Sequence, residues 1–153
     1  MTHKGTKKIE TDRLILRKFV EDDAIAAYNN WTSDDKVTEF LRWPTHTEMA
    51  ITESVVYDWI TESENDDFYQ WAIVLKELNE PIGVIEVVDK NESLNMLHIE
   101  YCIGHSGNVM KKCGLVYEGT LRQADYSNKG LVDACIYSIL KGDWTKSNVR
   151  KNN

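Results

Sequence analysis

The sequence has few cysteines and no long apolar run. No stretch approaches the roughly eighteen apolar residues that cross a membrane, and the opening MTHKGTKKIE lacks the apolar core of a signal peptide. The three cysteines, Cys102, Cys113 and Cys135, are odd in number and lie far apart in apolar segments. This pattern indicates reduced, buried thiols rather than a disulfide framework, and none has metal-site spacing. We therefore expect a cytoplasmic protein without a membrane anchor or a bound metal.

An excess of positive charge is also absent. The net charge of −7 argues against nucleic acid or an anionic membrane as a partner, because Lys and Arg supply most of the affinity for phosphate. An acidic surface instead favours a basic or neutral substrate. The chain has no repeats, low-complexity tracts or linkers, and 153 residues with 42% hydrophobic content fit one domain. We expect that domain to span residues 1–153, with 145–153 as a frayed polar tail.

Hydrophobic patterning predicts an α+β fold. Branched and aromatic runs predict strands over residues 14–19, 68–75, 82–88, 94–104, 116–122 and 131–140. A helix is expected over residues 24–31, because acidic residues precede it, and another over 47–63, where apolar residues recur every four positions. A third is expected over residues 109–113, which lie between two glycines. Residues 33–44, which end at Pro44, are expected to form a loop, and residues 89–93 a turn. The order is β-α-α-β-β-β-α-β-β, with a meander in the middle.

The third strand of the predicted meander alternates between two faces. One face carries Leu97, Ile99, Tyr101 and Ile103, and the other carries Met96, His98, Glu100 and Cys102. The first face is the more apolar, and we expect it to be the core face.

Four segments together carry a family resemblance, at residues 9–19 (IETDRLILRKF), 68–88, 96–104 and 109–144. They resemble the first strand, the central strands, and the closing helix and hairpin of the GNAT acetyltransferases, in particular of the subgroup that acetylates ribosomal-protein N-terminal alanine. The resemblance covers almost the whole chain. It implies a mixed, mostly antiparallel twisted sheet flanked by helices.

One part of the family pattern is missing from the sequence. Nothing matches the family's Gln/Arg-x-x-Gly-x-Gly/Ala pyrophosphate loop, the helix after it or the following strand, and residues 94–104 pass directly into 106–114. A strand with its crossover helix amounts to about thirty residues. The sequence therefore predicts a GNAT-like fold that lacks one helix and one strand.

The resemblance implies transfer of an acetyl group from acetyl-CoA to an amine, with two residues closest to the chemistry. Glu100 lies where related enzymes place a carboxylate that deprotonates the amine through water, although a carboxylate on a solvated sheet face or one paired with a lysine is the alternative. Ser106 matches a family serine that contacts the thiol end of the cofactor, although a helix N-cap explains it as well. His98 and His105 are weaker candidates for a base, and incidental histidines are the alternative.

The resemblance also implies two binding surfaces. The strand residues Tyr101, Cys102 and Ile103, followed by Ser106 and Asn108, would form the cofactor wall. The aromatic residues Trp31, Phe40 and Trp43 fall where the acceptor wall is expected, although aromatics at such spacings are often core or loop anchors.

Two functions remain open from the sequence. The first is an N-acetyltransferase whose acceptor is a protein N-terminus or a small amine, and the second is an inactive GNAT remnant that serves as a binding or dimerisation module. A strand edge left open by the missing unit would pair with another chain, so we also expect a homodimer.

Overall fold

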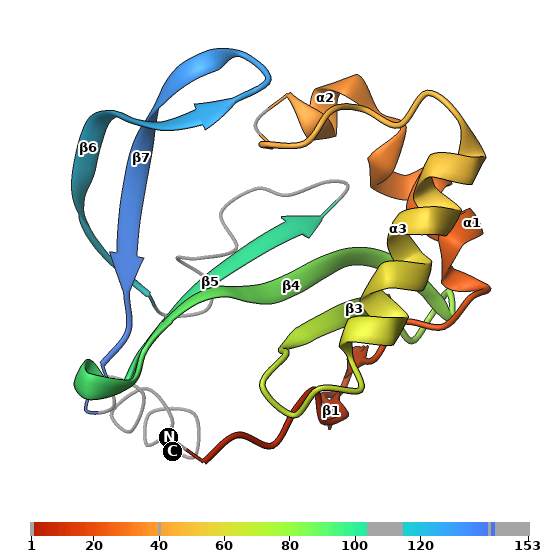
Figure 1. Ribbon diagram of the computed structural model, residues 1–153, viewed down its shortest axis with the longest axis horizontal. Coiled ribbons are helices and arrows are strands. Elements are labelled where there is room, and N and C mark those ends of the chain that lie inside the picture. Colours follow the sequence, from red (N-terminus) through yellow and green to blue (C-terminus); the bar gives the residue numbers. More distant parts are fainter. Residues whose placement is uncertain (1, 40, 104–114, 141, 143–153) are drawn as a thin grey trace. The chain divides into compact units, whose positions relative to one another are not determined.

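A computed structural model describes residues 2–39, 41–103, 115–140 and 142. They belong to two compact units (Figure 1). Unit 1 comprises Met1–Thr38 and Pro44–Gly104, and unit 2 comprises Glu39–Trp43 and His105–Asn153. The predicted helix over residues 109–113 lies outside the described residues.

Unit 1 is built on a five-stranded antiparallel sheet. Its strands are β1 (Ile9–Glu10), β2 (Leu14–Arg17), β3 (Gln70–Leu75), β4 (Glu80–Asn91) and β5 (Met96–Ile103), and they are ordered β1-β2-β3-β4-β5. Each strand pairs with its neighbour in the chain, which confirms the predicted meander. Strand β4 runs on to Asn91, and a 3₁₀ turn, η2 (Glu92–Leu94), joins it to β5. The predicted turn over residues 89–93 therefore begins later than expected.

The helices of unit 1 follow the predicted positions with one exception. Helix α1 (Asp23–Ala27) continues into a π-helical turn, η1 (Tyr28–Thr32), and helix α3 (Met49–Glu62) fills the predicted second helix. The prediction of a loop over residues 33–44 is wrong in part, because a short helix, α2 (Asp35–Thr38), forms there. The Asp34 side chain accepts a hydrogen bond from the Lys36 backbone N–H at 2.8 Å, which stabilises this first turn.

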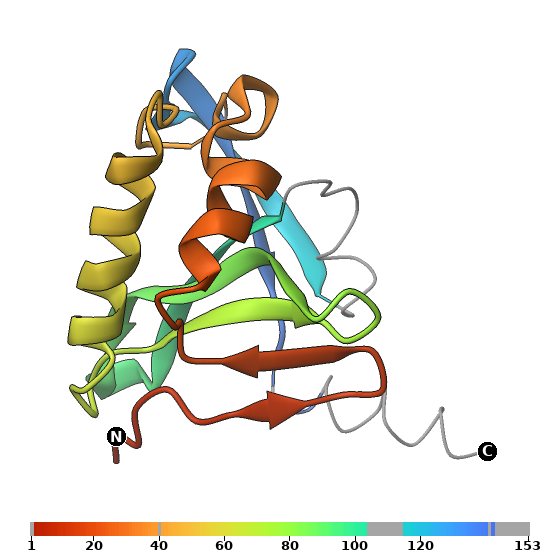
Figure 2. The same ribbon diagram turned by 90° about the vertical axis from the view of Figure 1, so that its right-hand side faces the viewer.

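Helices α1 and α3 lie side by side over one face of the sheet (Figures 1 and 2). A bidentate ion pair fixes α1 to the sheet: Arg17 of β2 donates to both carboxylate oxygens of Asp23, at 2.6 and 2.8 Å. The rings of Phe19 and Trp59, 4.7 Å apart, pack the end of α3 against the chain that leaves β2. The face that carries Arg17 is therefore the helix-covered face.

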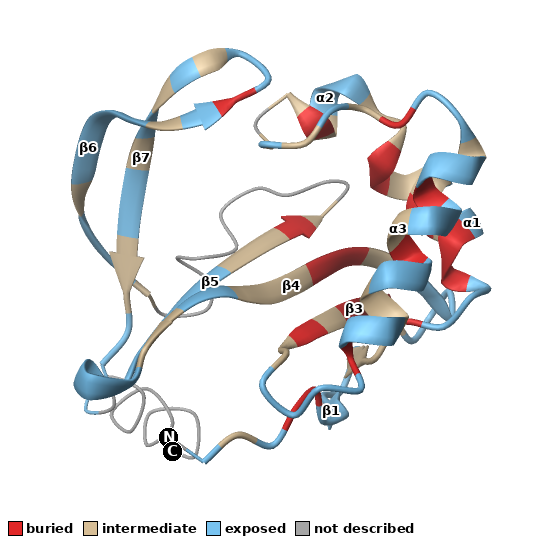
Figure 3. Ribbon diagram, in the orientation of Figure 1, coloured by how far each residue is buried: buried red, intermediate tan, exposed pale blue. Residues whose placement is uncertain are grey.

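The core of unit 1 lies between these helices and the sheet (Figure 3). Small and branched side chains let the layers approach closely, and burial of their apolar surface is the main favourable term in folding. The buried apolar residues are Phe19, Ala24, Ala27, Trp31, Val56, Ala72, Ile73, Val74, Val84 and Cys102.

The prediction for the faces of β5 is wrong in its outer half. Leu97 and Ile99 are 43% and 47% exposed, whereas Cys102 on the opposite face is 7% exposed. The reason is that Leu97 and Ile99 lie on the face of β5 that α1 and α3 do not cover. The helix-covered face of β5 is instead the one that carries Glu100 and Cys102.

Unit 2 is a long hairpin with a short segment against it. Strands β6 (Val116–Ser127) and β7 (Gly130–Ser138) form a two-stranded antiparallel sheet, as predicted for residues 116–122 and 131–140. The Asn128 side chain donates to the Trp43 carbonyl at 2.8 Å, and Arg42 forms an ion pair with Asp125 at 3.0 Å. These contacts hold Glu39–Trp43 against the hairpin turn.

The predicted fold class is confirmed. The described chain is a mixed α+β fold with a mostly antiparallel sheet flanked by helices. No helix in its described portion is both long and apolar enough to span a membrane.

Candidate active site

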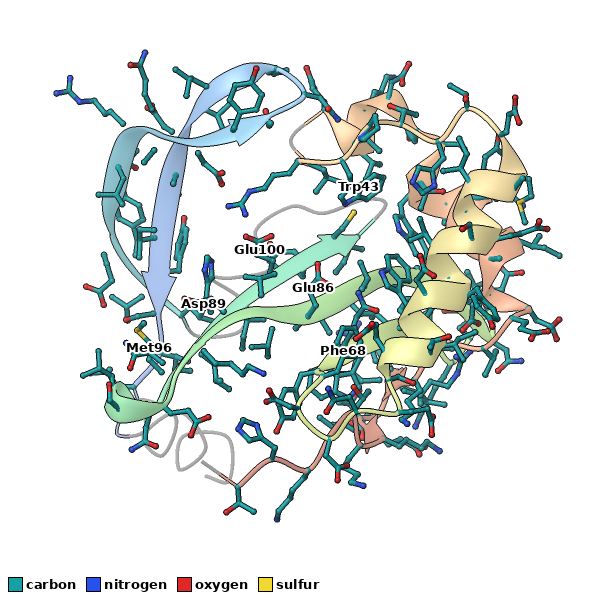
Figure 4. All side chains as sticks on the ribbon, in the orientation of Figure 1. Trp43, Phe68, Glu86, Asp89, Met96 and Glu100 are labelled. Atoms are coloured by element: carbon teal, nitrogen blue, oxygen red, sulfur yellow. The ribbon has the colours of Figure 1, made fainter. Side chains whose placement is uncertain are left out.

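Three polar side chains form a row across β3, β4 and β5. In the backbone register, Gln70 is opposite Glu86, and Glu86 is opposite Glu100. Directly opposite residues on antiparallel strands project to the same face of a sheet. Figure 4 shows Glu86 and Glu100 on the same side of their strands. The two acids, named the carboxylate pair below, therefore lie next to each other.

The pair lies on the helix-covered face of the sheet. Arg17 is opposite Ala72, which lies two residues along β3 from Gln70 and so projects to the same side. Ala72 is in turn opposite Val84, and Val84 is opposite Cys102. The row Gln70–Glu86–Glu100 thus borders a row of buried apolar residues, and this border reduces the solvation of the acids.

Glu86 is the more deeply placed acid of the pair. Its carboxylate accepts a hydrogen bond from Gln70 Nε2 at 2.9 Å, and Gln70 itself is only 3% exposed. Burial raises the pKa of Glu86 above its ordinary value, and the negative charge of Glu100 raises it further. The Gln70 hydrogen bond acts in the opposite direction, because an N–H donor favours the charged carboxylate. Glu86 therefore binds a proton more readily than an exposed glutamate does.

Glu100 is the more accessible acid of the pair. Its side chain is 37% exposed, and its Oε1 lies 3.9 Å from His98 Nε2. It belongs to β5, which is the last strand in the order of the described sheet. A water molecule or an amine can therefore approach Glu100 from solvent, as its predicted role requires; that role stays a prediction.

The residues predicted as a cofactor wall follow Glu100 along β5. Tyr101 and Ile103 are half-buried and project away from the helices, whereas Cys102 is buried on the helix-covered face. Burial raises the pKa of the Cys102 thiol to about 11. The thiol is therefore protonated near neutral pH, and Cys102 is a poor nucleophile there.

Gly83 brings β4 unusually close to this part of β5. It is opposite Ile103, and a Cβ atom at position 83 would lie 2.2 Å from the carbonyl oxygen of Cys102. Real Cβ atoms essentially never approach a backbone atom this closely. Glycine at position 83 thus sets the spacing of β4 and β5 beside Cys102 and Ile103.

The two remaining predicted site residues that the structure describes, Trp31 and Trp43, belong to different units. Trp31 is completely buried in unit 1, which agrees with its alternative interpretation as a core anchor. Trp43 is half-buried in unit 2, where its carbonyl oxygen is bonded by Asn128. Phe40, Ser106 and Asn108 lie outside the described residues, as does His105. No three His, Cys, Asp or Glu side chains within the described ranges are arranged to hold a metal ion.

Sequence reasoning missed Glu86 and Gln70. The available signal was a lone glutamate inside the apolar strand run IGVIEVV, where a buried acid needs an explanation. Placing it beside Glu100 required the register of the β4–β5 hairpin, which the sequence pattern alone does not give.

Comparisons with known proteins agree with this fold. The sequence model described as "Acetyltransferase (GNAT) domain" matches residues 13–143. That match runs through the sheet, the helices and the hairpin of unit 2. No curated protein sequence matches the chain significantly.

Solved structures with the same fold include several acetyltransferases. A GNAT-family acetyltransferase from Bacillus anthracis has a TM-score of 0.70 at 18% identity and covers 89% of this chain and 99% of its own. Microcin C7 self-immunity acetyltransferase MccE, solved with acetyl-CoA and AMP, has a TM-score of 0.68 at 16% identity. The match covers 85% of this chain and 93% of the MccE chain. A ribosomal-protein-S5-alanine acetyltransferase from Vibrio fischeri has a TM-score of 0.68 at 13% identity. The match covers 90% of this chain and 98% of the Vibrio chain. At these identities the likeness is one of fold.

Proposed function

The chain belongs to the GNAT acetyltransferase family, and on this basis we propose that it transfers the acetyl group of acetyl-CoA to an amine. The observation that carries this proposal is the carboxylate pair on β4 and β5, the last two strands in the order of the described sheet. An amine must lose a proton as its nitrogen attacks a thioester, and a partly buried carboxylate is a suitable acceptor for that proton. Glu100, the more exposed acid, is the residue that we propose meets the amine through a water molecule.

The acetyl donor would lie along β5. Bound acetyl-CoA supplies a thioester whose acetyl carbon is open to attack. Tyr101, Cys102 and Ile103 would border the donor arm, because they follow Glu100 along the last strand in the described sheet order. Ser106 and Asn108 are proposed to continue this wall. The protonated Cys102 thiol argues for direct transfer from donor to amine, without an acetylated cysteine.

The acceptor is proposed to be a cationic amine, either a protein N-terminus or a small-molecule amine. The protein carries a net charge of −7, and two acids project from adjacent strands on the same face. Both features attract an ammonium group. The Vibrio fischeri neighbour is a ribosomal-protein-S5-alanine acetyltransferase, so an alanine N-terminus is the first acceptor to test.

A second function is favoured by one specific observation. The sequence has no Gln/Arg-x-x-Gly-x-Gly/Ala motif, so the pyrophosphate of the donor lacks its usual cradle of backbone amides. The alternative is a GNAT scaffold that forms a homodimer without catalysing transfer. In that case sedimentation would show a dimer, and calorimetry would show no heat of acetyl-CoA binding.

The proposal is tested by titrating acetyl-CoA in a calorimeter and by measuring thiol release with an N-terminal-alanine peptide or spermidine as acceptor. We expect saturable binding that coenzyme A displaces, and turnover with at least one acceptor. Glu100→Gln should lower kcat about 100-fold or more while acetyl-CoA binding persists, because loss of a general base typically costs that much. Glu80→Gln, an exposed acid at the start of β4, is the matched control and should retain activity. Absence of both binding and turnover would refute the proposal.

A further inference from the structure

The Gln70 side chain is enclosed, and only one end of its amide is bonded. Its Nε2 donates to Glu86, whereas its Oε1 is buried with no hydrogen-bond partner in the described part of the chain. A buried carbonyl without a partner costs free energy, and an apolar residue at position 70 would avoid that cost. The hydrogen bond to Glu86 is therefore what the amide contributes at this position.

The two acids of the pair have different surroundings. Glu86 faces the uncharged Gln70 amide from β3, and Glu100 and the protonated Cys102 thiol from β5. From the helices above, α1 brings Asp23, which is already held by Arg17, and α3 buries only uncharged side chains. Within residues 2–39, 41–103 and 115–140, no positive charge compensates Glu86, and its one charged neighbour there is the other acid.

Directly opposite residues in an antiparallel pair have Cβ atoms about 4.5–5.5 Å apart. At that separation two carboxyl groups, or two carboxyl groups with one water between them, can share a single proton. Two acids that interact by more than about one pK unit titrate as a unit with two separated steps. The inner acid, Glu86, has the environment that retains the proton, and the outer acid, Glu100, has the access to solvent.

We propose that the carboxylate pair acts as one proton acceptor in the acetyl transfer proposed above, with Glu100 on the amine side, Glu86 holding the proton, and Gln70 positioning Glu86. The amine nitrogen forms a bond to the acetyl carbon, and the carbon–sulfur bond breaks. For an ammonium substrate one proton passes through Glu100 to Glu86, and a second protonates the departing thiolate. The products are the amide and the free thiol, and Glu86 later releases its proton to solvent.

The test is the pH dependence of kcat/KM for three variants. The acceptor is the alanine peptide or spermidine, whichever the wild type acetylates. Glu86→Gln should lower kcat/KM about 10- to 100-fold and move the acidic limb to lower pH, because the acid with the raised pKa is removed from the pair. Gln70→Met keeps the length of the side chain but removes the donor, so it should raise the pKa of Glu86 and move the acidic limb to higher pH. Glu80→Gln should leave both the rate and the acidic limb unchanged.

A second measurement does not depend on activity. Carbon-13 titration of the glutamate carboxyls by NMR should show Glu86 and Glu100 titrating together in two steps, with the upper step raised in Gln70→Met. Independent titrations of the two acids, or an unmoved acidic limb in both Glu86→Gln and Gln70→Met, would overturn the inference even if the enzyme is active. If no amine is acetylated, both the proposed function and the role of the pair as a proton acceptor are wrong. A coupled titration of Glu86 and Glu100 in that case would show that the pairing of the acids is nevertheless correct.

Discussion

Replacement of Asp23 by alanine tests how α1 is held against the sheet. The Asp23 side chain is 4% exposed, and it accepts two hydrogen bonds from Arg17 and one from the Val20 backbone N–H at 2.9 Å. Removal of Asp23 leaves a guanidinium that is only 28% exposed without its carboxylate, and leaves the Val20 N–H without its acceptor. Breaking a buried pair by deleting one partner costs about 3–5 kcal/mol, and the partial exposure of Arg17 places this case near the lower end.

A loss of about 3 kcal/mol corresponds to a decrease in Tm of about 6–12 °C for a chain of this size. Urea unfolding followed by circular dichroism should show a lower midpoint with an unchanged m-value, because the variant exposes the same surface on unfolding. Asp22→Ala is the matched control, because Asp22 makes no side-chain capping bond, and it should change stability by less than about 0.5 kcal/mol.

The double variant Arg17→Met/Asp23→Ala separates loss of the ion pair from loss of packing. It removes the uncompensated guanidinium, so it should be more stable than Asp23→Ala alone. Equal stability of Asp23→Ala and Asp22→Ala, or a double variant less stable than Asp23→Ala, would refute the assignment of this pair as the anchor of α1.

Two further predictions concern the contact between β4 and β5. Gly83→Ala should lower stability by about 1–3 kcal/mol in thermal unfolding, because its methyl group would overlap the Cys102 carbonyl oxygen; an unchanged Tm would show that the strands separate easily at this point. Cys102, with a pKa of about 11, should be about one part in a thousand thiolate at pH 8 and should react slowly with a thiol reagent. In a Cys113→Ser background we expect Ellman's reagent to react only with the exposed Cys135 in the native protein. In denaturant a second thiol, Cys102, should react as well. Rapid reaction of both thiols in the native protein would contradict the burial of Cys102.

The strands and the long helix were predictable because their local signals agree with the tertiary structure. The β3–β4 hairpin has branched and aromatic runs separated by turn residues, and these local preferences persist in the fold. The extent of α3 also followed from apolar spacing. The buried face of α3 did not, because Ile51 is 41% exposed while Thr52 is completely buried.

Burial of Thr52 depends on partners that are distant in the sequence. Its hydroxyl is 2.8 Å from both the Thr32 hydroxyl and His46 Nδ1, so its polar group is bonded inside the core. A periodicity count scores threonine as a polar residue and places it outside. Long-range hydrogen bonds of this kind decide the face, and a local pattern does not contain them.

The candidate site was predictable only in part, for a similar reason. Glu100 was found from its place in a family pattern, whereas Glu86 acquires its significance from the residue opposite it. That pairing depends on an irregularity in β4 between Val87 and Asp89, within a strand that runs on to Asn91. Because the predicted strand ended at Val88, the residue opposite Glu86 could not be found by counting back from the turn.

The same irregularity separates the two ends of the β4–β5 hairpin. Val88 is the extra residue, since Val87 is opposite Ile99 and Asp89 is opposite His98. On the turn side of Val88, a change in hairpin length alters which residues pair from Asp89 onward. On the other side, Glu86 keeps its place opposite Glu100. A change in the length of the hairpin tip therefore need not displace the two acids, because Glu86 stays opposite Glu100 on the far side of Val88.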